Sequence, residues 1–122
     1  METLKKKLLI IDDEPALIRI MGKFAEKLNW DAICVENGAK GIEALQNVPE
    51  SFTAVIIDYN LPGEFSEEIL VKLKQLNPEL KCVLSTGFNA DQISTQYKRV
   101  EIDKTLQKPF NLTDFKNLLD SL

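Results

Sequence analysis

The sequence has 122 residues, of which 44% are hydrophobic and 28% are charged, and this balance is typical of one soluble globular domain. No apolar run approaches the ~20 residues that a membrane-spanning helix requires. The formal net charge of −4 argues against nucleic-acid binding through a basic patch. Histidine is absent, which excludes histidine bases, histidine metal ligands and histidine-activated nucleophiles within this chain.

The N-terminal half of the chain predicts three strands separated by two helices. The strands are expected at residues 7–11, 32–35 and 52–58, where short runs are rich in apolar or β-branched side chains. Glu14 and Pro15 open the first helix, because acidic residues and proline both favour a first helical turn. Its predicted inward face consists of Leu17, Ile20, Met21, Phe24, Ala25 and Leu28. The predicted inward face of the second helix consists of Ile42, Ala44, Leu45 and Val48.

The C-terminal half continues the alternation of strand and helix. Strands are predicted at residues 81–86 and 102–107, and the second is expected at a sheet edge because it is poorer in apolar residues. The third helix is predicted to bury Ile69, Leu70, Leu73 and Leu76. A fourth helix is predicted within residues 88–100, despite weak periodicity. Asn111 is expected to cap a last helix, whose inward face consists of Leu112, Phe115, Leu118, Leu119 and Leu122.

Five alternations of strand and helix with short connections predict an α/β fold. The expected architecture is a doubly wound, five-stranded parallel sheet with right-handed crossovers. No internal repeat or linker divides the chain. The two cysteines, Cys34 and Cys82, lie in β-like runs and are predicted to be small buried thiols rather than a disulfide or a metal pair.

Polar side chains gather at the carboxyl ends of four predicted strands, namely Asp12 and Asp13, Asp58, Thr86 and Lys108. Doubly wound sheets bind their ligands at this edge. Three carboxylates within about 5 Å of one another would repel by roughly 1 to 3 kcal/mol per pair, so a cation is expected among them. Mg²⁺ suits a site of oxygen ligands. Asp58 is therefore predicted to be a nucleophile that accepts a phosphoryl group, whose oxygens Thr86 and Lys108 contact.

Each of these residues also has an ordinary structural interpretation. Asp12 and Asp13 alone are compatible with charge stabilisation of a helix N-terminus. Asp58 and Thr86 are compatible with turns, and Lys108 with a solvated surface charge. Their joint placement at the ends of four strands favours the functional interpretation.

Four motifs resemble those of the receiver domain of two-component response regulators of the chemotaxis-regulator type: residues 9–14 (LIIDDE), 58–63 (DYNLPG), 85–87 (STG) and 107–110 (QKPF). The resemblance covers essentially the whole chain. It implies a single receiver domain over residues 1–122 with a flavodoxin-like (βα)5 fold and strand order 2-1-3-4-5.

The resemblance also implies the ligands of the metal and the acceptor of the phosphoryl group. Asp58 is implied to be the phosphoacceptor. Asp13, and more indirectly Asp12, are implied to hold Mg²⁺ together with Asp58 and the backbone carbonyl of Asn60. Mn²⁺ is expected to substitute for Mg²⁺.

The same resemblance implies roles around the phosphoryl group. Thr86 is implied to be the switch hydroxyl and Lys108 the cation that pairs with the phosphoryl group. The Lys108–Pro109 peptide bond is implied to be cis. Asn60 and Phe88 flank the site and are predicted to tune hydrolysis.

Two positions depart from the pattern of the family. Thr105 stands where the family usually has Tyr or Phe, so the aromatic ring that swings inward with the switch hydroxyl is missing. We hypothesise that Tyr97 or Phe88 substitutes for it, or that backbone shifts of the loop after the fourth strand carry the signal. Ser66 stands where the family often has Gly, and this change is expected to be tolerated at a helix start.

The predicted function is a signalling switch that catalyses only its own phosphoryl uptake and hydrolysis. The donor is expected to be a phosphohistidine on a histidine kinase or histidine phosphotransfer protein. The target is an unidentified protein that contacts the face of the fourth helix, fifth strand and last helix, with no direct binding to nucleic acid or membrane. The first apolar run ends at Asp12, too soon for a signal peptide, so a cytoplasmic location is expected.

Other interpretations remain open at this point. A degenerate receiver could act as a constitutive docking module. A phosphatase of the haloacid dehalogenase type would need an Asp-x-Asp motif after its first strand, which Asp12 and Glu14 only imitate. A flavodoxin-like FMN binder would need a phosphate loop where two carboxylates stand. The receiver could be free-standing, as Met1 and the short lead-in favour, or a module of a hybrid kinase or larger regulator.

Overall fold

A computed structural model describes residues 5–122 and contains five strands and five α-helices in alternation, with one short 3-10 helix. The elements are β1 (Lys7–Ile11), α1 (Pro15–Lys27), β2 (Asp31–Val35), α2 (Gly38–Asn47), η1 (Pro49–Ser51), β3 (Ala54–Asp58), α3 (Ser66–Leu76), β4 (Lys81–Thr86), α4 (Ala90–Ser94), β5 (Lys104–Gln107) and α5 (Leu112–Asp120). Within residues 5–122, none of the helices combines the length and the apolar character needed to cross a bilayer.

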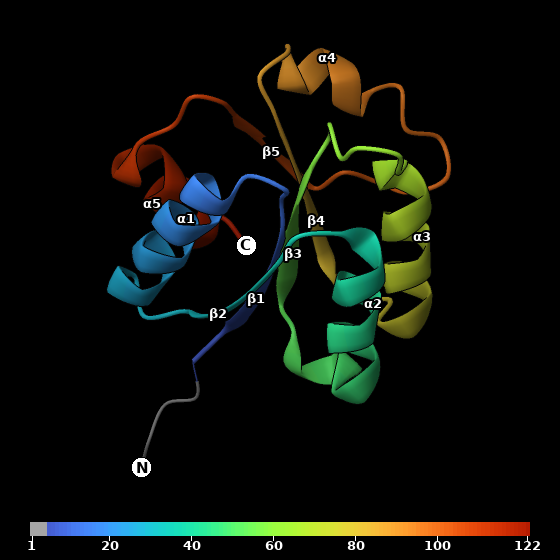
Figure 1. Cartoon of the computed structure of the whole chain (residues 1–122), viewed down its shortest axis with the longest axis horizontal. Helices are drawn as coiled ribbons and strands as arrows, with labels where there is room; N and C mark the ends of the chain where they lie inside the picture. The colour runs from blue at the N-terminus through green and yellow to red at the C-terminus, as the bar shows by residue number, and fades with distance from the viewer. Residues whose placement is uncertain (1–4) are drawn as a thin grey trace.

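The strands form one parallel sheet in the order β2-β1-β3-β4-β5. The predicted fold class and strand order are therefore confirmed, and β5 lies at an edge as its composition indicated. Helices α1 and α5 cover one face of the sheet, while α2 and α3 cover the other (Figure 1). All five residues of β3 are buried, because this central strand has a layer of helices on both sides.

The core has two parts, one on each face of the sheet, because successive side chains of the central strands point to opposite faces. Leu8 and Ile10 of β1 pack on the side of α1 and α5, whereas Leu9 and Ile11 pack on the side of α2 and α3. This alternation follows from the two-residue repeat of a strand. Phe115 of α5 is fully buried in the first part, where its ring stands edge-on to Phe24 of α1.

The helix starts follow local sequence signals. Pro15 occupies the first turn of α1, as predicted. Asn111 caps α5, since its side chain accepts a hydrogen bond from the backbone N–H of Asp114 and the Asp114 carboxylate accepts one from the N–H of Asn111. Asn37 caps α2 through one hydrogen bond, which its side-chain oxygen accepts from the N–H of Lys40.

Three predictions about side chains and boundaries are wrong. Ile20 is 45% exposed and lies at the margin of the inward face of α1. Val48 is 46% exposed because α2 ends at Asn47, so its side chain no longer follows the helical repeat. Cys82 is buried as predicted, but Cys34 is only half-buried because β2 is an edge strand; both thiols are free.

Helix α4 is much shorter than the predicted segment 88–100. It ends at Ser94, although the following residues carry no proline or glycine that would stop a helix. The backbone N–H groups of Lys98 and Arg99 instead donate to the carboxylate of Glu67 on α3, each at 2.7 Å. A tertiary contact therefore replaces the hydrogen bonds of a further helical turn.

Replacing Phe115 with alanine is expected to lower the free energy of unfolding by about 3 to 5 kcal/mol, because the change empties a fully buried site between α1 and α5. Urea unfolding followed by circular dichroism measures this loss. The matched control is Phe65→Ala, since Phe65 is 74% exposed and its loss should cost no more than about 0.5 kcal/mol. Equal losses for the two variants would contradict the assignment of the core.

Candidate functional site

The site lies at the carboxyl ends of the central strands β1 and β3. The chain leaves β1 toward β2 on one side and returns to β3 on the other, so the strand order reverses between β1 and β3. A crevice at such a reversal is where doubly wound sheets bind ligands. Asp12 follows β1 directly, and Asp58 is the last residue of β3. The sequence therefore places both carboxylates at this crevice.

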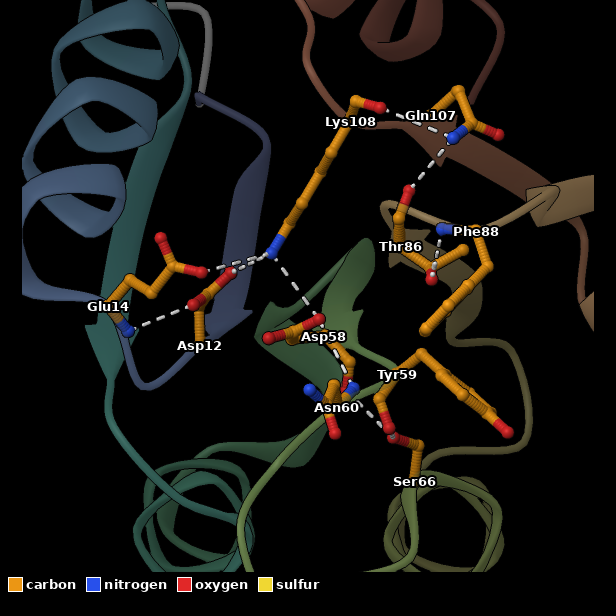
Figure 2. A network of polar contacts seen from close by, with 10 residues as sticks. All are labelled: Asp12, Glu14, Asp58, Tyr59, Asn60, Ser66, Thr86, Phe88, Gln107 and Lys108. Carbon is orange, nitrogen blue, oxygen red and sulfur yellow. Dashed lines mark hydrogen bonds and ion pairs between the residues drawn. The ribbon is translucent and has the colours of Figure 1, made fainter.

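One lysine holds two buried carboxylates together (Figure 2). The Nζ atom of Lys108 lies 3.3 Å from Oδ2 of Asp12 and 3.3 Å from Oδ1 of Asp58. Asp12 is 1% exposed and Asp58 is 4% exposed, whereas the Lys108 side chain is 17% exposed. Glu14 is a more distant partner, with its Oε1 atom 3.9 Å from the same ammonium group. Residues from three separate strand ends thus meet in one ion cluster.

Backbone hydrogen bonds fix the orientation of both carboxylates. Oδ1 of Asp12 accepts a hydrogen bond of 3.0 Å from the N–H of Glu14, at the start of α1. Oδ1 of Asp58 accepts one of 3.2 Å from the N–H of Asn60. Within residues 5–122, no hydrogen bond reaches Oδ2 of Asp58. One oxygen of this carboxylate is therefore anchored and the other is available to a ligand.

Burial and neighbouring charges shift the pKa values of Asp12 and Lys108. Burial raises the pKa of Asp12, although the hydrogen bond from Glu14 and the nearby Lys108 oppose this rise. Burial alone would lower the pKa of Lys108, but the charges of Asp12 and Asp58 outweigh it and raise this pKa. The ammonium group is therefore charged at neutral pH, while ionised Asp12 is a net cost to the folded state.

Carboxylate oxygens of Asp12, Glu14 and Asp58 lie within 4.8 Å of one another and could hold a metal ion. Oxygen-only donors of this kind suit Mg²⁺. Asp13 is exposed and is not one of these three residues, but it lines a cavity of about 450 Å³ together with Glu14 and Asp58. Glu14 was predicted to open a helix and was not predicted to be a metal ligand. Its place immediately after two aspartates was the signal that could have identified it.

Thr86 and Phe88 border the same cavity. Thr86 is 2% exposed, and its hydroxyl oxygen accepts a hydrogen bond of 3.1 Å from the N–H of Phe88. The carbonyl of Thr86 accepts a hydrogen bond of 2.8 Å from the N–H of Lys108, which ties the ends of β4 and β5 together. Phe88 is 62% exposed, and its ring stands edge-on to that of Tyr59 at 6.4 Å between centroids.

Three positions that the comparison with the family pattern singled out, Pro109, Thr105 and Ser66, have a defined structure. The peptide bond between Lys108 and Pro109 is cis, as predicted. Thr105, which stands where the family usually has an aromatic residue, contacts α4 instead: its hydroxyl donates a hydrogen bond of 2.8 Å to Oδ1 of Asp91. Ser66 is buried, and its hydroxyl donates to the carbonyl of Asp58 at 2.7 Å, a contact that the sequence did not reveal.

Comparison with known sequences identifies the family. The family model for the response regulator receiver domain matches residues 8–120, and the chain therefore belongs to this family. Members of the family act as signalling switches. The response regulator receiver protein CpdR of Brucella abortus is 28% identical over 117 residues, which are 96% of this chain and 96% of that protein.

Two other comparisons concern a longer protein and a solved structure. A cyclic di-GMP phosphodiesterase of Thermotoga maritima is 28% identical over 104 residues, which are 85% of this chain but only 27% of that protein. A solved structure of the chemotaxis protein CheY4 of Vibrio cholerae has a TM-score of 0.88 at 18% identity and covers 97% of this chain and 98% of that one. This structural similarity supports the fold alone.

The Asp12→Asn variant is expected to have a higher free energy of unfolding than the original protein at pH 7 in the absence of divalent metal. Because burial raises the pKa of Asp12 in the folded state, its ionised form destabilises that state, and an amide removes this penalty. The difference should shrink as the pH falls through the folded-state pKa of Asp12, where the carboxyl group becomes neutral. Urea unfolding in EDTA at several pH values measures both effects.

The matched control for this test is Asp31→Asn, which removes an exposed carboxylate from β2. This control should stay within about 0.5 kcal/mol of the original protein at every pH. A destabilised Asp12→Asn variant at pH 7 would contradict the electrostatic account.

Proposed function

We propose that this protein is a receiver switch that accepts a phosphoryl group on Asp58 from a phosphohistidine of a partner protein in a Mg²⁺-dependent reaction. The observation that carries this proposal is the position of Lys108, whose Nζ atom lies 3.3 Å from each of two buried carboxylates on different strands. The family and the strand order β2-β1-β3-β4-β5 support it further. The proposed domain comprises residues 1–122, of which residues 1–4 lie outside the described part.

The proposed chemistry is an exchange of bonds at phosphorus. An oxygen of Asp58 forms the new O–P bond of an acyl phosphate while the N–P bond of the phosphohistidine breaks, and the imidazole keeps the electron pair. Lys108 compensates negative charge on the phosphoryl oxygens, and the buried Thr86 offers them a hydroxyl group. Water later attacks phosphorus and releases inorganic phosphate, which restores the Asp58 carboxylate. Asn60 and Phe88 border this space and are proposed to tune that hydrolysis.

The carboxylates of Asp12, Asp13 and Asp58, with the backbone carbonyl of Asn60, are the proposed ligands of the ion, and Glu14 is an additional candidate. Mg²⁺, or Mn²⁺ in its place, would supply compensation of the charge that crowds at the phosphoryl group. The two buried carboxylates and one ammonium group leave a surplus of one negative charge, which supports the binding of a cation here.

The partners are proposed from the absence of histidine in the sequence and from the family. The 122 residues contain no histidine, so the phosphohistidine lies outside them, and we propose that it belongs to a histidine kinase or a histidine phosphotransfer protein. The output is proposed to be contact with a further protein through the face of α4, β5 and α5. Two free cysteines fit a reducing compartment, and we therefore propose a cytoplasmic location.

The Asp58→Asn variant is expected to lose all labelling by acetyl phosphate in the presence of Mg²⁺, because an amide is a poor nucleophile at this position. Intact-protein mass spectrometry measures the added phosphoryl group, and circular dichroism verifies the fold. The control variant Asp31→Asn should be labelled like the original protein, since its carboxylate lies exposed on β2. Labelling that persists in Asp58→Asn would refute the assignment of the phosphoacceptor. An original protein that is never labelled would instead favour a constitutive docking module.

Mg²⁺ is expected to stabilise the folded protein by mass action, with a gain of about 2.7 kcal/mol at a concentration one hundred times the dissociation constant. The effect should disappear in Asp13→Asn, since this change removes one proposed ligand from the cavity border. Thermal unfolding at increasing MgCl₂, with CaCl₂ in parallel, measures the shift in Tm. A Tm that does not respond to Mg²⁺ would contradict the proposed metal site.

A further inference from the structure

Ser66, the first residue of α3, holds the backbone of the turn that follows Asp58. Its side chain is 3% exposed, and its hydroxyl lies 2.7 Å from the carbonyl oxygen of Asp58 and 3.2 Å from that of Tyr59 (Figure 2). A hydroxyl group has one proton to donate, so the shorter of these contacts is the stronger hydrogen bond. Any shift of the Asp58 carbonyl therefore acts directly on the first turn of α3.

Glu67, the next residue, holds a different part of the chain. Its Oε2 atom accepts hydrogen bonds from the backbone N–H groups of Lys98 and Arg99, each at 2.7 Å. Hydrogen bonds to a charged acceptor are short and strong. The segment between α4 and β5, residues 95–103, is thereby attached to the same helical turn that contacts Asp58.

The two contacts belong to one groove. A groove of about 520 Å³ is lined by both tyrosines, Tyr59 and Tyr97, and by Ser66 and Glu67. Burial raises the pKa of Tyr97 to about 12, and the neighbouring Ser66 hydroxyl acts in the opposite direction. The hydroxyl of Tyr97 thus remains protonated at neutral pH beside Ser66. The groove also gives the segment that carries Tyr97 free volume into which it can move.

We propose that the first turn of α3 transmits the phosphorylation state of Asp58 to residues 95–103, with Ser66 as the positioning residue and Glu67 as the anchor. This inference rests on the proposed function, because it requires that Asp58 changes its charge and shape. A phosphoryl group on Asp58 draws its side chain toward new partners and displaces the carbonyl that Ser66 holds. Glu67 moves with the same helical turn and displaces the N–H groups of Lys98 and Arg99.

A second chain of hydrogen bonds, through Gln107, is the alternative path for the same signal. The side-chain N–H of Gln107 donates to the carbonyl of Thr86 at 3.3 Å, and its side-chain oxygen accepts a hydrogen bond of 3.0 Å from the N–H of Ala90. This route leads from the end of β4 to the first residue of α4. It does not include Ser66, so a change at Ser66 separates the two routes.

The test is the amide spectrum of the full chain with and without beryllofluoride, a phosphoryl mimic, in the presence of Mg²⁺. We expect the amides of Lys98 and Arg99 to shift on addition of the mimic in the original protein. In Ser66→Ala this shift should fall by at least half, while the shift of the Asn60 amide beside Asp58 is retained. Because Ser66 also lies beside Tyr97 of the same segment, Tyr97→Phe is the matched control: a loss caused only by this local contact would appear in Tyr97→Phe as well, whereas transmission from Asp58 would leave the shift of that variant intact.

Glu67→Ala is the second variant and should also lose the response of Lys98 and Arg99 to the mimic. Its control is Glu68→Ala, which removes the same charge from the same helical turn at an exposed position and should behave like the original protein. Since Glu67 is half-buried at the surface, its loss should leave the fold intact, which circular dichroism verifies.

The remaining outcomes separate the two proposals. If the original protein shows no response to beryllofluoride at any amide, the proposed function fails, and this inference fails with it. If Asn60 responds but Lys98 and Arg99 do not, or if they respond equally in Ser66→Ala and the original protein, only the transmission through α3 is refuted. A response that survives in Ser66→Ala and vanishes in Gln107→Ala would assign the signal to the competing route.

Discussion

The ion cluster of Asp12, Asp58 and Lys108 is the constraint on which the rest of the structure depends. Two carboxylates in a nearly water-free position repel each other, and one ammonium group at 3.3 Å from each compensates only part of their charge. Such a cluster is a poor way to gain stability, since burial costs each charge its hydration. This cost is explained by the proposed function, in which a bound cation balances the surplus negative charge of the cluster.

The sheet makes this costly arrangement possible. Strand β3 is buried on both faces and pairs with β1 and β4 along its length, so the position of Asp58 is fixed by a rigid element rather than by a loop. The cation comes from the other end of the chain, because Lys108 follows the edge strand β5 and its N–H bonds to the carbonyl of Thr86. A site built from strand ends is thus held in place before any ligand arrives.

The fold and most of the site could be predicted from the sequence because both depend on strong local patterns. Apolar runs that end at Asp12 and Asp58 identify buried strands and the edge at which they end, and the cis peptide at Pro109 follows from the resemblance. The features that depend on tertiary contacts could not be predicted from the sequence. The early end of α4 depends on Glu67, which is more than thirty residues distant from the amides it binds, and no window of sequence contains that information.

The side chains around α4 and β5 are polar, and this limits the ways in which the proposed switch can work. Thr105 donates to Asp91 and has no ring to rotate, so a signal that depends on the burial of an aromatic side chain at this position is not available. Hydrogen bonds are directional and weaken steeply with small changes in angle. Contacts such as those of Ser66 and Gln107 can therefore convert a shift of a few tenths of an ångström at a strand end into the loss of one partner and the gain of another. In this chain, hydrogen bonds from side chains to the backbone, rather than an aromatic ring at position 105, are the contacts through which the proposed switch would act.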